Sequence, residues 1–282
     1  MKLHLDTAEI YMPDGENTKT ALSRTTHLCF SAHQDDIEIM AAQPIFECFQ
    51  RRDKWFTGVV VTDGRGSPRK GIYDEYSDDE MRLTRFKEQR KAAYVGEFSA
   101  LAMLDYPSKI VKEGSRSEPV EDMVRILRAA RPHFVYTHNL ADKHDTHVAV
   151  ALRVIEAVRR LGQAERPERV VGCEVWRALD WMVDADKVLM NLSDHENLQL
   201  ALLGVFDSQI AGGKRYDLAS MGRRRANATY FESHGVDITT GLSYAMDMTS
   251  LMNDAQKDPA QFTQEFIQRF AQDVGERIKR MS

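Results

Sequence analysis

Four ionisable side chains lie within six consecutive positions near the start of the chain: His33, Asp35, Asp36 and Glu38. Packing alone rarely requires so many ionisable groups in so short a stretch. His33 and either aspartate could bind one divalent metal ion through nitrogen and oxygen. The second aspartate would then remain free to accept a proton. The stretch therefore predicts a metal site next to a general base.

A second stretch, in the middle of the chain, offers a further metal ligand. The spacing His144-x-x-His147 places two imidazoles within one helical turn, on roughly the same side. His33, Asp36 and His147 would then form a set of two histidines and one carboxylate, with open positions for water and substrate. Such a set is typical of hydrolytic zinc, and it also occurs with non-haem iron.

Both stretches follow short apolar runs that are expected to be strands. Residues 26–30 precede His33, and residues 133–136 precede the histidine pair. A further apolar run that begins at Ile39 is expected to be a helix. Open α/β sheets bind ligands at the carboxyl ends of their strands, so both stretches are expected at that edge of one sheet.

The rest of the chain alternates strand-like and helix-like patterns as far as Trp176. We therefore predict an α/β fold: a doubly wound, mostly parallel sheet of about five or more strands with a helical C-terminal part. No linker rich in proline, glycine or serine is visible, so residues 1–282 are expected to form a single domain, with a core at about 25–180 and a helical C-terminal extension at about 181–282. The strands are expected at residues 26–30, 55–62, 100–106, 133–136 and 170–176, and the C-terminal helices at 194–209, 216–233 and 259–279.

The two motifs together resemble the LmbE-like (PIG-L) family of zinc N-deacetylases. The chain has Ala-His-x-Asp-Asp-x-Glu from Ala32 and His-x-x-His from His144. The family includes enzymes that remove acetyl groups from N-acetylglucosamine conjugates. Two positions depart from its pattern: Gln34 stands where the family usually has proline, and Asp145-Thr146 stands where it usually has Pro-Asp. Neither departure removes an implied ligand, and both concern how the ligands are oriented.

The resemblance implies a role for each residue of the two motifs. His33, Asp36 and His147 are expected to bind zinc, which activates water and polarises an amide carbonyl. Asp35 is expected to be the general base. His144 is expected to act as the acid, or as an electrophile near the developing oxyanion.

Two more residues are expected to reach the substrate. Arg85 lies in an Arg-x-x-Glu pattern whose arginine faces the substrate in the family, although a surface ion pair with Glu88 would explain the pattern equally well. Asp142 is expected to accept a hydrogen bond from His144 and to raise its pKa. Several other histidines lack a comparable carboxylate cluster and are expected to be structural: His27, His133, His138, His195 and His234.

These features leave three classes of function open. The first is a zinc hydrolase that removes an N-acetyl or other N-acyl group from an amino sugar or an N-acetylglucosamine-type glycoconjugate. The second is another mononuclear-metal enzyme, such as a non-haem iron oxygenase. The third is a non-catalytic, sugar-binding descendant of a deacetylase. Metal analysis separates the first two classes, and turnover of N-acetylated sugars separates the first from the third.

Net charge, cysteine content and apolar segments limit which partners and which cellular compartment are expected. The net charge is −5 and no basic block offsets it, so nucleic acid is not expected as a partner. The three cysteines, Cys29, Cys48 and Cys173, have no CxxC spacing and indicate neither a disulfide framework nor a thiolate metal site. No apolar segment resembles a signal peptide or a membrane span. A cytoplasmic enzyme without a membrane partner is expected, and a homo-oligomer is compatible with these features.

Overall fold

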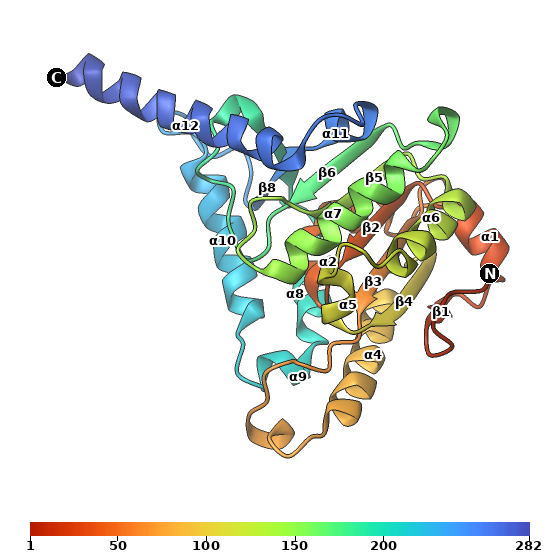
Figure 1. Cartoon of the computed structure of the whole chain (residues 1–282). Helices are drawn as coiled ribbons and strands as arrows, with labels where there is room; N and C mark the ends of the chain where they lie inside the picture. The colour runs from red at the N-terminus through yellow and green to blue at the C-terminus, as the bar shows by residue number, and fades with distance from the viewer.

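Eight strands form one mixed sheet in the computed structural model, which describes all 282 residues (Figure 1). The strand order is β1-β4-β3-β2-β5-β6-β8-β7. The strands are β1 (Glu9–Tyr11), β2 (His27–Ser31), β3 (Phe56–Thr62), β4 (Ala100–Tyr106), β5 (Phe134–His138), β6 (Arg169–Cys173), β7 (Lys187–Asn191) and β8 (Leu242–Asp247).

Twelve α-helices connect and cover these strands. They are α1 (Thr18–Ser23), α2 (Asp36–Met40), α3 (Ala42–Cys48), α4 (Asp78–Val95), α5 (Ser108–Lys112), α6 (Glu118–Ala130), α7 (Asp145–Arg159), α8 (Glu196–Gly204), α9 (Asp207–Ile210), α10 (Tyr216–Tyr230), α11 (Thr249–Asn253) and α12 (Pro259–Met281). No helix is both long and apolar enough to cross a lipid bilayer.

The central strands β4, β3, β2, β5 and β6 are all parallel, as the alternating pattern predicts. All seven residues of β3 are buried, because helices cover both faces of the sheet. The strands β1, β7 and β8 are antiparallel and lie at or near the two edges of the sheet.

The chain changes direction across the sheet at β2. From β2 it continues outward through β3 to β4, and it then returns to place β5 on the opposite side of β2. The carboxyl ends of β2 and β5 therefore flank the topological switch point, where open α/β sheets bind their ligands. The histidine-carboxylate stretch follows β2, and the histidine pair follows β5. Two motifs about a hundred residues apart in the sequence are neighbours in the fold.

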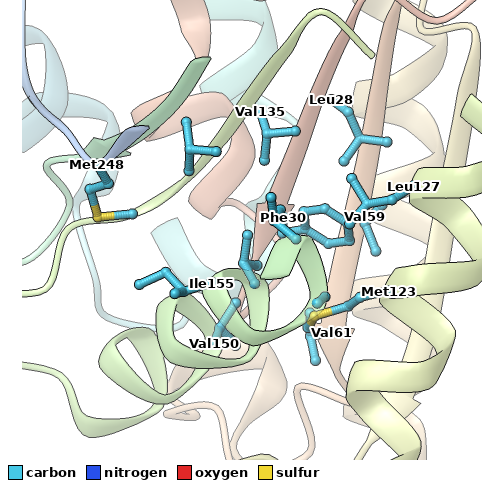
Figure 2. Close-up of a cluster of buried hydrophobic side chains, with 14 of the residues drawn as sticks. Leu28, Phe30, Val59, Val61, Met123, Leu127, Val135, Val150, Ile155 and Met248 are labelled. Atoms are coloured by element: carbon cyan, nitrogen blue, oxygen red, sulfur yellow. The ribbon is translucent and has the colours of Figure 1, made fainter. Parts of the chain in front are cut away.

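Alternate strand residues fill two separate cores, one on each face of the sheet. Figure 2 shows Phe30 and Val59 packed among side chains of α6 and α7, including Met123 and Val150. On the opposite face, strand residues such as Val60 pack against α2, α3, α4 and α8. This alternation fixes the register of each strand, because a shift by one residue would exchange the two faces.

The C-terminal part is mainly helical, as expected, but it also extends the sheet. β8 pairs antiparallel with β6, and β7 pairs antiparallel with β8. The expected helical part is therefore confirmed, and the two strands β7 and β8 within it were not predicted. The physical reason is that β6 would otherwise be an edge strand with unpaired backbone groups, and β8 satisfies them.

A buried carboxylate joins this C-terminal part to the end of β6. Oε1 of Glu174 accepts hydrogen bonds from Asn227 Nδ2 (2.8 Å), Ser243 Oγ (3.1 Å) and the Tyr244 amide (3.1 Å). Oε2 accepts one from the Leu179 amide at 2.9 Å. One side chain thus connects β6 with β8 and α10.

Replacing Glu174 by alanine should lower the free energy of unfolding by about 2–5 kcal/mol, because several buried donors would lose their acceptor. Urea unfolding followed by circular dichroism measures this. Glu196→Ala is the control, because its ion pair with Arg225 is exposed and should contribute little. Equal unfolding midpoints for the two variants would contradict the structural role of Glu174.

The last helix, α12, leaves the body of the molecule. Phe262 and Phe266 near its N-terminus are buried, whereas its later residues are exposed or half-buried. Figure 1 shows the helix projecting beyond the sheet towards the C-terminus. It takes no part in the site described below.

Candidate active site

Three donor atoms converge at the switch point. His33 Nδ1 lies 3.2 Å from Asp36 Oδ2 and 3.2 Å from His147 Nε2, and His147 Nε2 lies 3.3 Å from Asp36 Oδ2. Ligands placed about 2.0–2.1 Å from a tetrahedral metal ion lie about 3.3 Å from one another. The expected ligand set is therefore brought together with the spacing that a tetrahedral divalent metal such as zinc requires.

Local backbone geometry fixes these three donor residues. His33 follows β2, and its amide donates to Asp36 Oδ2 at 2.8 Å. Asp36 is the first residue of α2, and His147 lies in the first turn of α7. Each ligand therefore comes from the junction between a strand end and the helix that follows, where the backbone is held from both sides.

Asp142 contacts the ring nitrogen of His147 that is not part of the donor triangle. Its Oδ2 lies 3.4 Å from His147 Nδ1 and also accepts the Trp176 amide at 3.1 Å. Burial opposes protonation of His147, but the carboxylates of Asp36 and Asp142 outweigh it and raise the pKa of His147 to about 9. A carboxylate on the outer nitrogen fixes the orientation of a ligating imidazole and makes it more basic.

The expected hydrogen bond from the His144 imidazole to Asp142 is wrong. Asp142 Oδ1 accepts the backbone amide of His144 at 3.0 Å, while its other oxygen lies beside His147. Burial and the neighbouring imidazoles of His147 and His33 lower the pKa of His144 to about 4. His144 is therefore neutral near pH 7, and it can donate through only one ring nitrogen.

Asp142→Asn should weaken metal binding by about 10- to 100-fold, because the amide is a poorer acceptor for the outer nitrogen of His147. Titration with a competing chromophoric chelator measures the affinity. Asp145→Asn serves as the control, because Asp145 is exposed in the same helical turn. An affinity that falls equally in both variants, or in neither, would remove Asp142 as the support of His147.

Asp35 is held in an unusual conformation beside the three converging donors. Its φ of 90° is uncommon for a residue with a side chain. Its amide donates to Gln89 Oε1 at 3.2 Å, and its Oδ2 lies 3.1 Å from Arg85 Nη2. Burial raises the pKa of Asp35 to about 7 against the opposing effect of Arg85. Strained backbone of this kind persists where the surroundings enforce it, and it clusters at functional sites.

Arg85 is buried rather than a member of a surface pair. It donates to Ser67 Oγ and to the Gln34 carbonyl in addition to Asp35. Glu88 instead accepts hydrogen bonds from the Ser208 amide (2.7 Å) and hydroxyl (2.6 Å). The alternative of a surface ion pair between Arg85 and Glu88 is therefore wrong, and Arg85 contacts the carboxylate expected to be the base.

These residues open into a cavity of about 450 Å³, within the size range of small-molecule sites. Thr62 at the end of β3 and Asp63 and Gly64 in the loop after it form one side. His33, Asp35, Asp36, Arg85 and His144 reach the same cavity. The remaining lining residues are Gly66, Ser67, Pro68, Ser108, Lys112, Thr146, Trp176, Gln209, Lys214 and Tyr216.

Residues 28–158 match the sequence model of the PIG-L family, which is described as GlcNAc-PI de-N-acetylase. This segment is a PIG-L family domain. It contains both motifs and every residue expected to act in catalysis or to bind metal. None of the curated proteins compared with the chain matches it in sequence.

Solved structures share the fold at low sequence identity. N,N'-diacetylchitobiose deacetylase from Pyrococcus horikoshii superposes with a TM-score of 0.60 at 17% identity, covering 86% of this chain and 90% of that one. The 4-carboxy-2-hydroxymuconate hydratase GalB from Pseudomonas putida KT2440 gives 0.58 at 15% identity, covering 79% and 96%. The A40926 pseudoaglycone deacetylase gives 0.57 at 14% identity, covering 79% and 97%. Deacetylases and a hydratase share this fold, so the reaction must be argued from the site.

Gln34, which stands where the family usually has proline, is packed inside the PIG-L domain. The Gln34 side chain is buried, and its Nε2 donates to the Thr62 carbonyl at 3.2 Å. A Cβ at Gly64 would lie 2.4 Å from Gln34 Oε1, and Gly64 has a φ of 70°. Only glycine suits both the space and the backbone conformation at this position. The second departure leaves Thr146 buried at the cavity wall and Asp145 exposed.

Sequence reasoning missed how close His138 lies to the three converging donors. Its Nε2 accepts the Ala32 amide at 2.8 Å, and its ring stacks on that of His147 at 3.9 Å between centroids. His138 is buried at the end of β5, so it supports the site rather than facing the cavity. The rule that ligands bind at strand ends would have identified it, because it is the last residue of a central strand.

Part of the cavity wall lies outside the PIG-L domain. Trp176 follows β6, while Gln209, Lys214 and Tyr216 come from α9, α10 and the turn between them. Trp176 could have been found by the same strand-end rule. No sequence pattern marks the other three, because contacts between distant segments bring them to the cavity.

Proposed function

We propose that this protein is a zinc-dependent hydrolase that removes an N-acetyl or other N-acyl group from an amino sugar or an N-acetylglucosamine-type glycoconjugate. The observation that carries the proposal is the triangle of His33, Asp36 and His147 donor atoms, which opens beside Asp35 into a polar cavity. A hydrolytic metal site needs this combination of three protein ligands, an open position and a base.

Each residue around this triangle would have a separate role in amide hydrolysis. A bound zinc ion would lower the pKa of water and polarise the amide carbonyl. Asp35 would accept a proton from the attacking water and later pass it to the leaving amine. A neutral His144 would donate a hydrogen bond to the oxygen that becomes negative in the transition state. Arg85 would hold the Asp35 carboxylate in place through its contact at 3.1 Å.

The cavity lining supports a sugar rather than an apolar substrate. Most of the lining side chains are polar, and the principal apolar surface comes from Trp176 and Tyr216, whose rings meet edge to face at 6.0 Å. An aromatic ring can cover the apolar face of a pyranose while polar neighbours bind its hydroxyl groups.

Acetate release from a panel of N-acetylhexosamine derivatives tests the proposal. The purified protein should release acetate with zinc present, and a chelator should abolish the activity until zinc is restored. Release that is insensitive to the chelator would contradict metal dependence. The absence of release from every zinc-supplemented sugar would instead favour a non-catalytic, sugar-binding protein.

A further inference from the structure

The carboxylates that line the cavity already have cationic partners. Asp35 lies 3.1 Å from Arg85 Nη2, and Asp63 lies 3.3 Å from Arg65 Nε. Asp36 contacts the imidazoles that complete the ligand triangle. None of these acidic groups is therefore left to neutralise a further cation in the cavity.

Two lysines that line the same cavity have no such partner. Lys112 and Lys214 line the cavity, and no carboxylate forms an ion pair with either. Lys214 Nζ lies 5.1 Å from the centre of the Trp176 ring. Some lysines outside the cavity are paired, as Lys54 is with Glu47 at 3.3 Å. The cavity lining thus includes two positive charges without an ion-pair partner.

The structure holds the backbone of both lysines in place. Lys112 ends α5, directly after Val111, which is fully buried. The Lys214 amide donates to the Gln209 carbonyl at 2.8 Å, within the segment that follows α9. Two contacts fasten α9 to the PIG-L domain: Ser208 donates to Glu88, and the Tyr73 hydroxyl donates to Asp207 at 2.5 Å. The two ammonium groups are therefore carried to the cavity by anchored segments.

We propose that the substrate carries an anionic group, a carboxylate or a phosphate, in addition to its N-acyl group, and that Lys112 and Lys214 bind this anion. This inference rests on the proposed function. Ion pairs between an ammonium group and a carboxylate or phosphate oxygen are short and strong, and they strengthen in a partly enclosed cavity. Positive charge without a partner in a cleft also raises the local concentration of an anionic ligand.

The test compares neutral and anionic substrates of the zinc-loaded full-length protein. N-acetylglucosamine is the neutral substrate, N-acetylglucosamine 6-phosphate carries a phosphate, and N-acetylmuramic acid carries a carboxylate. At least one anionic sugar should have a kcat/KM about tenfold or more above that of the neutral sugar, and added salt should reduce the difference.

The lysines should account for that preference. Lys112→Gln and Lys214→Gln should each raise KM for the preferred anionic sugar by about tenfold, with little effect on the neutral one. Lys109→Gln is the matched control, because Lys109 is exposed on α5 but does not line the cavity. An equal loss on neutral and anionic sugars would indicate a general structural defect and overturn the assignment.

Binding of deacetylated sugars gives a readout that does not depend on turnover. Calorimetry should show tighter binding of glucosamine 6-phosphate or muramic acid than of glucosamine, and Lys112→Gln and Lys214→Gln should remove the difference. Equal kcat/KM and equal binding for neutral and anionic sugars would overturn the anionic substrate while leaving the proposed function intact. No acetate release from any sugar would contradict the proposed function, and this inference with it.

Discussion

Replacing Asp35 by asparagine should lower kcat by about 10²- to 10⁴-fold while the protein keeps its metal. The amide has nearly the shape of the carboxylate, but it cannot accept the proton of the attacking water. The side chain also lies 3.1 Å from Arg85, so the variant leaves a buried cation without its counter-charge. Thermal unfolding and circular dichroism should therefore accompany the kinetics and the elemental analysis.

Asp36→Ala is the matched comparison for this experiment, because it removes the neighbouring carboxylate that is proposed as a ligand. It should lose both metal and activity. If Asp35→Asn lost metal to the same degree as Asp36→Ala, the two aspartates would have to exchange roles. Near-normal turnover by a folded Asp35→Asn protein would remove Asp35 as the base.

His147→Ala should lose most of the bound metal, whereas the wild-type protein should carry about one divalent ion per chain. The substitution removes one corner of the donor triangle and leaves Asp142 without the imidazole that it supports. Elemental analysis after dialysis against metal-free buffer measures the loss.

His144→Ala provides the control, because His144 precedes His147 by one helical turn but is not among the three converging donors. It should lower the rate and leave the metal content largely intact. Unchanged metal content in His147→Ala would show that the ligand assignment is wrong. Equal metal loss in both variants would mean that this turn is needed as a whole and that the separate roles are not justified.

The sequence predicted the central sheet and the convergence of the two motifs because both follow from local patterns. Apolar runs marked the five parallel strands, and the strand-end rule placed His33 and His147 at one edge. The helix that carries Arg85 also has local signals at both ends, since Ser77 and Glu80 form a capping box at its start and Gly96 follows its last residue.

Contacts between segments far apart in the sequence could not be predicted from such local patterns. β8 is a strand chiefly because β6 offers it an unpaired edge, and its own six residues carry little strand signal. Either His144 or His147 could have contacted the Asp142 carboxylate, and their spacing in the sequence does not decide between them. Gln209 and Lys214 reach the cavity through contacts of α9 with α4 and the loop before it.

The contacts between α9 and the PIG-L domain allow one part of the cavity wall to vary in sequence while the other part stays constant. The donor triangle and Asp35 lie within residues 28–158, whereas Lys214 and Tyr216 belong to a segment that only docks onto them. Mutations in that segment are therefore expected to alter which molecules bind without moving the donor triangle. The Ser208–Glu88 hydrogen bond would then keep the segment attached while the residues that follow Ser208 are varied. Libraries aimed at a new preference should therefore vary residues 209–216 and keep Ser208 and Glu88 constant.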